Sequence, residues 1–183
     1  MNLYKISLDR NHPSVRQGFV DRQDLHINIQ QFFDGCREET KVLYRVHESD
    51  VYVSAKTLPI CNEKNGMRIQ TSKEMPEHGK GDQCRFNILT QPYIKRQGKR
   101  IPLIHDKERM DWLIKQGEKH GFRILTAREM GNTSIASHKK RFELKAYYYS
   151  GVLEVTDEVA FIDALENGIG ASKAYGLGML MVV

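Results

Sequence analysis

The run from residue 168 to the C-terminus reads GIGASKAYGLGMLMVV and combines four glycines with one lysine, Lys173. Glycine lets the backbone approach a ligand closely, or take positive φ values that a Cβ would forbid. A cradle of backbone N–H groups with one ammonium would suit an RNA phosphodiester. The candidate RNA contacts in this run are Gly168, Gly170, Ser172, Lys173 and Gly176.

The same run also has a purely structural interpretation. Gly168 could be the C′ residue of a helix, and the glycines after it could form a tight corner before a last strand. The order helix, glycines, strand is the reverse of a P-loop or a dinucleotide-binding motif, in which a helix N-terminus follows the glycines. The run therefore predicts neither ATP nor NAD binding, and we expect no small-molecule cofactor.

Two clusters of basic side chains are further candidate contacts to a polyanion. The first cluster is Lys95, Arg96, Lys99 and Arg100. The second cluster is His138, Lys139, Lys140 and Arg141, with Lys145 shortly after it. Such clusters are often only solvated loops. Contacts to the phosphates and 2′-hydroxyls of an A-form RNA stem would suit both clusters, with specificity coming from the shape of the hairpin.

The composition limits other kinds of chemistry. The 183 residues carry a formal net charge of +5, which is compatible with a nucleic-acid partner. The three cysteines, Cys36, Cys61 and Cys84, are widely spaced, and the histidines form no H-x-x-x-H pattern, so we expect neither a disulfide framework nor a metal site. No run approaches the roughly 18 apolar residues of a membrane helix, and we expect a soluble, cytoplasmic protein.

Hydrophobic periodicity and turn residues predict the elements of the first half. They are a strand over 3–8, a helix over 23–33 with Asp21 as its N-cap, a hairpin of 41–47 and 51–58, a polar stretch over 61–81 with at most a short helix, and a strand over 83–89. The residue before Pro92 is pushed towards extended geometry, and a charged patch follows. We therefore expect one domain over 1–91 and a second over 92–183.

The second half follows a similar order. In chain order, the patterns predict a strand over 100–104, a helix over 106–119, a strand over 122–126, a loop over 129–137, a long strand over 141–155, a helix over 157–167 and a last strand over 177–183. This is the β-α-β-β-α-β order of a ferredoxin-like domain, with both helices on one face of an antiparallel sheet. The first half fits the same scheme with a weakened second helix. The predicted fold is therefore α+β, with two tandem ferredoxin-like domains.

These segments together resemble a known family. Residues 151–182, GVLEVTDEVAFIDALENGIGASKAYGLGMLMV, look like the C-terminal signature of the CRISPR-associated pre-crRNA processing endoribonucleases of type I-E systems, the CasE family of the RAMP superfamily. Residues 3–6 resemble that family's first strand, 85–92 its RFRLRANP-like strand, and 98–103 the segment after it. The resemblance covers nearly the whole chain, although 60–80 and 126–141 are unlike or shortened.

The resemblance implies two ferredoxin-like domains, binding of a CRISPR repeat RNA hairpin, and one metal-independent cut at the base of its stem. The position matching the family's catalytic histidine is His26, in the predicted first helix. An imidazole with an ordinary pKa near 6.5 can take the proton of a ribose 2′-hydroxyl or donate one to a leaving 5′-oxygen. The resemblance also implies that the protein keeps its product and joins the crRNA-guided surveillance complex of type I-E systems.

The sequence departs from the family pattern beside His26. Family members usually carry a tyrosine three residues earlier, where this chain has Gln23, and an amide can donate a hydrogen bond but cannot exchange a proton. The helix after His26 is neutral, because no lysine or arginine lies between His26 and Arg37. The charge of the transition state would then require a cation from elsewhere, for which Lys173 is the first candidate.

Three hypotheses follow. The first is the endoribonuclease, and the second is a hairpin-binding subunit of the same fold that has lost cleavage, as Gln23 and the neutral helix would allow. The third is an unrelated RNA-recognition module, which is weaker because the aromatic RNP motif of such modules is missing. Cleavage without metal separates the first hypothesis from the others.

Overall fold

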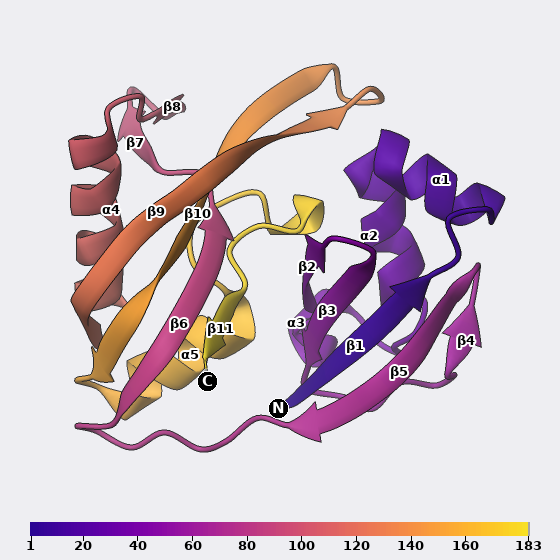
Figure 1. The fold of residues 1–183 in the computed structure, drawn as a ribbon, viewed down its shortest axis with the longest axis horizontal. Coiled ribbons are helices and arrows are strands. Elements are labelled where there is room, and N and C mark those ends of the chain that lie inside the picture. Colours follow the sequence, from indigo (N-terminus) through magenta and orange to yellow (C-terminus); the bar gives the residue numbers. More distant parts are fainter. Residues whose placement is uncertain (183) are drawn as a thin grey trace. The chain divides into compact units, whose positions relative to one another are not determined.

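The computed structural model describes residues 1–182 and contains two larger sheets and a two-stranded ribbon (Figure 1). The chain forms two compact units. The first comprises residues 1–76, 134–144 and 173–176. The second comprises residues 77–133, 145–172 and the chain from 177 onward.

The first unit contains a five-stranded sheet in the order β2-β3-β1-β5-β4. Its elements are β1 (Asn2–Leu8), α1 (Pro13–Val20), α2 (Arg22–Gln30), α3 (Arg37–Thr40), β2 (Leu43–His47), β3 (Asp50–Ala55), β4 (Glu63–Lys64) and β5 (Met67–Glu74). The central strand, β1, pairs antiparallel with both β3 and β5. Without the short β4, the strands have the ferredoxin-like order that the sequence predicted.

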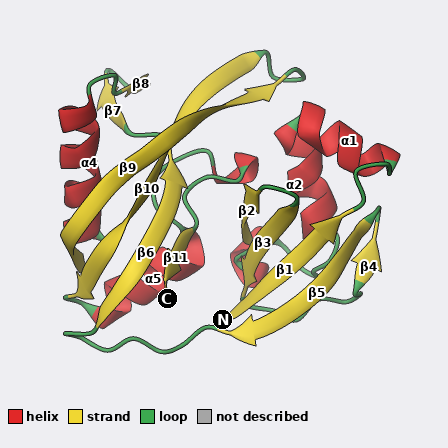
Figure 2. Ribbon diagram, viewed as in Figure 1, coloured by secondary structure: helices red, strands yellow, loops and turns green. Residues whose placement is uncertain are grey.

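The second unit contains a four-stranded sheet in the order β11-β6-β10-β9. Its elements are β6 (Gln83–Thr90), β7 (Tyr93–Arg96), β8 (Lys99–Pro102), α4 (Asp106–Lys119), β9 (Phe122–Ser137), β10 (Phe142–Val155), α5 (Glu158–Asn167) and β11 (Leu180–Val182). The ends of β9 and β10 next to their shared turn, residues 134–137 and 142–144, belong to the first unit. Strands β7 and β8 form a separate two-stranded ribbon. Figure 2 distinguishes these strands from the helices. This strand order is again ferredoxin-like, so the predicted fold class is confirmed.

The expected boundary at residue 91 is wrong for this structure. Strand β6 pairs with β10 and β11 and therefore belongs to the second sheet. The fourth strand of the first sheet is instead β5, inside the stretch predicted to be polar loop. Met67 is its only buried residue, and β5 is held through backbone pairing with β1. A strand with so little apolar alternation gives no period-two signal in the sequence.

Other differences have similar causes. Helix α1 was not predicted, because it buries only Val15 and Gly18 and lacks a clear apolar stripe. Residues 129–137, expected as a loop, continue β9, whose outer part is largely exposed and polar. The strand predicted over 100–104 is the ribbon strand β8, outside the main sheet. The weakened second helix of the first half is absent, and an irregular stretch over 56–62 takes its place.

The core of the first unit explains why α2 forms where the sequence predicted it. Leu25 and Ile29 are fully buried one turn apart and pack in one hydrophobic cluster with Tyr4 and Ile6 of β1 and Val53 of β3. Burial of two such side chains contributes about 3–6 kcal/mol. This packing fixes one face of α2 against the sheet and determines which residues lie on its other faces.

Candidate active site

Helix α2 is held at its N-terminus by Asp21, the cap that the sequence predicted. One carboxylate oxygen of Asp21 accepts a hydrogen bond from the Gln23 N–H at 2.9 Å. The other accepts from the Ser137 hydroxyl at 2.9 Å and the Lys139 N–H at 3.0 Å. Burial alone would raise the Asp21 pKa, but these hydrogen bonds outweigh it, and the pKa lies below its ordinary value. Asp21 thus joins α2 to the turn between β9 and β10.

His26 lies on α2 with 8% of its surface exposed. Its ring stacks on that of Tyr44 from β2, with centroids 5.9 Å apart and planes inclined by 22°. The Tyr44 hydroxyl lies 3.1 Å from the carbonyl oxygens of both Arg22 and Ala174. Burial raises the Tyr44 pKa well above its ordinary value, although the nearby Arg22 charge opposes the rise. Tyr44 therefore remains a hydrogen-bond donor and orients the imidazole without exchanging protons.

Part of the glycine-rich run lies beside α2. Residues Lys173–Tyr175 form a short 3₁₀ helix, η1, which packs against α2 and β2 within the first unit. Gly176 follows with a φ of +80°, and a Cβ there would lie 2.9 Å from the Tyr44 ring. The close backbone approach that the glycines predicted is thus the approach of Gly176 to the Tyr44 ring. Lys173 belongs to η1, which contacts α2, the helix of His26.

The earlier residues of this run lie in the second unit, where the structural interpretation accounts for them. Gly168 ends α5 with a φ of +70°, and its N–H donates to the Ala164 carbonyl at 2.9 Å. Gly170 packs against Thr90 and the Trp112 ring. Ser172 takes a left-handed backbone conformation, with a φ of +63°.

Arg22, which the sequence analysis passed over, lies one helical turn before His26. Its guanidinium carbon lies 5.1 Å from the centre of the Phe19 ring. The Nη1 atom is buried and has no hydrogen-bond partner among residues 1–182. Burial lowers the Arg22 pKa, and Tyr44 partly offsets the shift. Its i, i+4 spacing to His26 is the signal in the sequence that indicates a cation beside the imidazole.

Gln23 lies on α2 and is half-buried. Its side-chain oxygen Oε1 is buried without a hydrogen-bond partner among the described residues. An amide can orient a neighbouring group through hydrogen bonds but cannot act as an acid or base. Its position on the helix of His26 is therefore compatible with an orienting role only.

The two basic clusters lie in different units. The first occupies the β7–β8 ribbon, where Lys95 is opposite Arg100 and Arg96 is opposite Lys99, all four exposed. Like charges directly opposite each other destabilise a ribbon. Lys145 belongs to the same unit and lies 5.6 Å from the centre of the Tyr147 ring.

The second cluster forms the turn between β9 and β10 in the first unit. The Lys139 ammonium donates to Asp24 of α2, so its charge is already paired. Lys140 lies 5.7 Å from the centre of the Tyr175 ring of η1. His138 and Arg141 are exposed. The cluster is thus connected to both α2 and η1.

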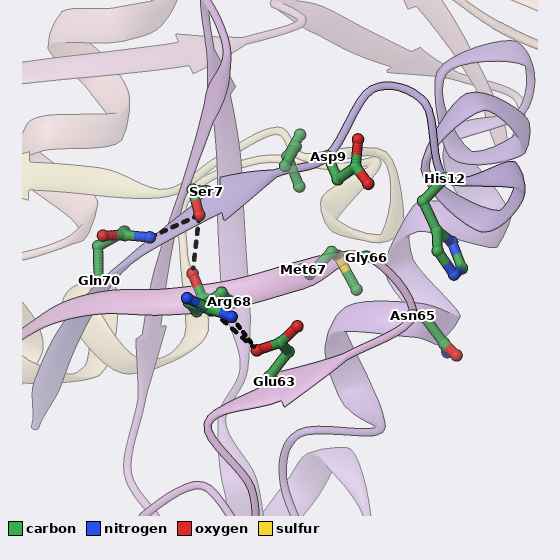
Figure 3. Close-up of a pocket in the computed structure, with 10 residues that line it drawn as sticks. Ser7, Asp9, His12, Glu63, Asn65, Gly66, Met67, Arg68 and Gln70 are labelled. Carbon is green, nitrogen blue, oxygen red and sulfur yellow. Dashed lines mark hydrogen bonds and ion pairs between the residues drawn. The ribbon is translucent and has the colours of Figure 1, made fainter.

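A separate hollow of about 630 Å³ lies in the first unit, where β1 ends beside β4 and β5 (Figure 3). Several of its polar groups already bind one another. Arg68 pairs with Glu63 at 2.6 Å, and Gln70 donates to the Ser7 hydroxyl at 2.8 Å. None of its side chains has a buried unpaired polar atom among the described residues. The hollow therefore offers no chemistry comparable to that beside His26.

Among residues 1–182, no group of three or more histidine, cysteine, aspartate or glutamate side chains could hold a metal ion. No helix within the same range is both long and apolar enough to cross a membrane.

Comparison with known proteins identifies similar chains. Residues 1–183 match the model of a family described as "CRISPR associated protein". A curated relative, the CRISPR-associated endoribonuclease Cse3 of Thermus thermophilus, is 24% identical over 209 residues, covering 100% of this chain and 99% of that one.

Solved structures share the fold. A CRISPR endoribonuclease Cse3 bound to a 19 nt RNA has a TM-score of 0.92 and 24% identity, with 100% of this chain and 97% of that chain covered. A chain of a CRISPR RNA-guided surveillance complex, described as pre-nicking, has a TM-score of 0.71 and 17% identity, with 100% and 99% covered. These likenesses agree with the two ferredoxin-like strand orders described above.

Proposed function

Because the chain belongs to the family of CRISPR-associated proteins, we propose that it is a metal-independent endoribonuclease. In this proposal it binds a CRISPR repeat RNA hairpin, cuts it once at the base of the stem and thereby matures crRNA. The endoribonuclease activity named for the Thermus thermophilus relative supports this reaction class. The resemblance of residues 151–182 to the CasE signature supports the type I-E assignment.

One observation carries the proposal. His26 lies on the capped helix α2 and stacks on the Tyr44 ring, in the same unit as η1 and the second basic cluster. A histidine fixed in this way can exchange protons near neutral pH without a metal. RNA groups that bind beside α2 and η1 would meet an oriented imidazole.

The proposed reaction is an in-line transesterification. The ribose 2′-oxygen attacks the adjacent phosphorus, its proton leaves to a base, and the bond from phosphorus to the 5′-oxygen breaks. The leaving 5′-oxygen takes up a proton, so the products are a 2′,3′-cyclic phosphate and a 5′-hydroxyl. His26 serves as the base or acid, Gln23 orients a reacting group by hydrogen bonding, and Lys173 supplies positive charge near the phosphate.

Binding of the hairpin involves the glycine-rich run and both basic clusters. The second cluster contributes His138, Lys140 and Arg141 to the phosphates of the stem, and Lys139 keeps its pairing with Asp24. The exposed cations of the β7–β8 ribbon, with Lys145, add a second contact to the RNA backbone, because an RNA phosphate would relieve their mutual repulsion.

After the cut the protein stays bound to its product hairpin and joins the other subunits of the type I-E surveillance complex in the cytoplasm. The TM-score of 0.71 to a chain of an RNA-guided surveillance complex supports this membership. The match covers 100% of this chain and 99% of that chain, so it includes both halves of the fold.

A denaturing gel tests the reaction. Excess protein is incubated in EDTA with an end-labelled repeat hairpin, and wild type is compared with His26→Ala and with an RNA carrying a 2′-deoxy nucleotide at the cut. We expect one cut by the wild type, no cut after either change, and unchanged binding. His12→Ala is the matched control, because His12 caps α1 and should leave cleavage intact. Cleavage by His26→Ala at the wild-type rate would contradict the role of His26.

The alternative function is a hairpin-binding subunit that does not cleave. Gln23 favours it, because an amide stands where the family usually carries a tyrosine that can exchange a proton. Under the same conditions, a hairpin that binds tightly to wild type but remains intact would support this alternative. Restoration of cleavage by Gln23→Tyr would then locate the cause of the loss.

A further inference from the structure

Arg22 and His26 lie one turn apart on α2, and Arg22 is the only lysine or arginine of this helix. Side chains four residues apart share a helix face, with Cβ atoms about 5–6 Å from each other. Tyr44 connects the two residues, because its ring stacks on His26 and its hydroxyl lies 3.1 Å from the Arg22 carbonyl oxygen. The Arg22 charge is also close enough to act on the Tyr44 pKa. A cation and an imidazole therefore occupy neighbouring positions.

The Arg22 guanidinium is incompletely paired. Its Nη1 atom is buried without an acceptor among the described residues, and its contact with the Phe19 ring at 5.1 Å supplies no negative charge. Arg10 lies 5.4 Å from the centre of the same ring, which adds a second positive charge. A buried guanidinium edge without a partner is unfavourable, and an incoming anion would relieve it. Arg22 is half-buried as a whole, so part of the side chain remains accessible.

Other charges near α2 are already paired. The Lys139 ammonium donates to Asp24, and Asp24 also accepts from Gln17. The carboxylate of Asp21 binds Gln23, Ser137 and Lys139. No ion pair joins Arg22 to a carboxylate within the described residues. Arg22 is thus a cation on the helix of His26 whose charge this part of the protein does not neutralise.

We propose that Arg22 is a further catalytic residue, which binds a non-bridging oxygen of the phosphate that is cut. This inference rests on the proposed endoribonuclease function. As the 2′-oxygen attacks, negative charge grows on the non-bridging oxygens, and the guanidinium stabilises it by charge-assisted hydrogen bonds. Arg22 moves no proton and adds a second cation to that of Lys173. It supplies positive charge on a helix that is otherwise without a lysine or arginine.

Single-turnover cleavage of the repeat hairpin in EDTA tests this role, with saturating full-length wild type, Arg22→Gln and Arg22→Lys. Loss of one transition-state donor should slow Arg22→Gln by roughly 100-fold or more. The dissociation constant should change by only a few-fold, and Arg22→Lys should recover part of the rate. Arg68→Gln is the control, because Arg68 pairs with Glu63 at the separate hollow and its loss removes the same charge.

Phosphorothioate substitution at the cut distinguishes contact from a structural role. Sulfur in place of the oxygen that Arg22 binds should slow wild type in one diastereomer, and this difference between diastereomers should shrink in Arg22→Gln.

Equal cleavage by wild type and Arg22→Gln would overturn the inference and leave the proposed function intact. A slow Arg22→Gln that keeps the full diastereomer difference would assign Arg22 a structural role and overturn it too. If wild type does not cut, the proposed function fails and the inference fails with it.

Discussion

The Tyr44 ring stacks on the His26 imidazole with centroids 5.9 Å apart, while its hydroxyl lies 3.1 Å from the carbonyl oxygens of Arg22 and Ala174. One side chain therefore orients the candidate catalytic histidine and joins the first turn of α2 to η1. The aromatic face and the polar end of Tyr44 act on different partners, so substitutions can separate their effects.

Removal of only the hydroxyl tests the polar end. Tyr44→Phe should lower the free energy of unfolding by about 1 kcal/mol, whereas Tyr44→Ala should lower it by about 3–5 kcal/mol because the buried ring is lost as well. Urea denaturation measures both. Tyr52→Phe, a half-buried tyrosine on β3 of the same unit, is the control and should be neutral. A Tyr44→Phe variant as stable as wild type would show that the hydroxyl contributes nothing.

Gly176 should tolerate no side chain. Its φ of +80° disfavours an L residue, and a Cβ would also lie 2.9 Å from the Tyr44 ring. Gly98 is a matched control, because its φ is +76° but no atom among the described residues lies within 4 Å of a Cβ there. We expect Gly98→Ala to cost about 1 kcal/mol and Gly176→Ala about 2–4 kcal/mol, measured by thermal or urea unfolding. Equal losses would mean that the contact with Tyr44 adds no strain.

Asp21 should make stability depend on acid pH. Its pKa is lower in the folded protein than the ordinary 3.8, so its contribution is fully present above about pH 5 and is lost as pH falls through the folded pKa. We expect wild type to lose more stability than Asp21→Asn between about pH 5 and about pH 2. At neutral pH, Asp21→Asn should be the less stable protein by about 1 kcal/mol. Parallel curves for the two proteins would contradict the linkage.

Lys139 and Arg141 form a matched pair for RNA binding, because they belong to the same turn and carry the same charge. The Lys139 ammonium is already paired with Asp24, whereas Arg141 is exposed. Arg141→Gln should reduce the slope of log affinity against log salt by about 1, and Lys139→Gln should reduce it less. Filter binding at several salt concentrations measures the slopes. A larger effect from Lys139→Gln would show that RNA displaces Asp24.

Strong local signals made much of the fold predictable. The sequence shows the N-cap Asp21, the apolar stripe of α2, and the limits of helices α4 and α5. Each of these features appears in the structure where it was expected. The boundary at 91 failed because β5 is almost entirely exposed and β6 resembles any apolar strand. Which sheet a strand joins depends on backbone pairing with residues far away in the chain, and no local pattern encodes it.

The candidate site divides in the same way. The sequence by itself determined the chemistry available: an imidazole at His26, an amide at Gln23 and a glycine-rich run that must accept a close approach. Only the tertiary structure decided that Tyr44 makes that approach to Gly176, and that the Lys139 charge is paired with Asp24. The same holds for the buried Nη1 atom of Arg22, which has no partner within residues 1–182. Residue types fix which interactions are possible, whereas packing across β2, α2 and η1 selects the ones that form, because burial and pairing depend on neighbours that are distant in sequence.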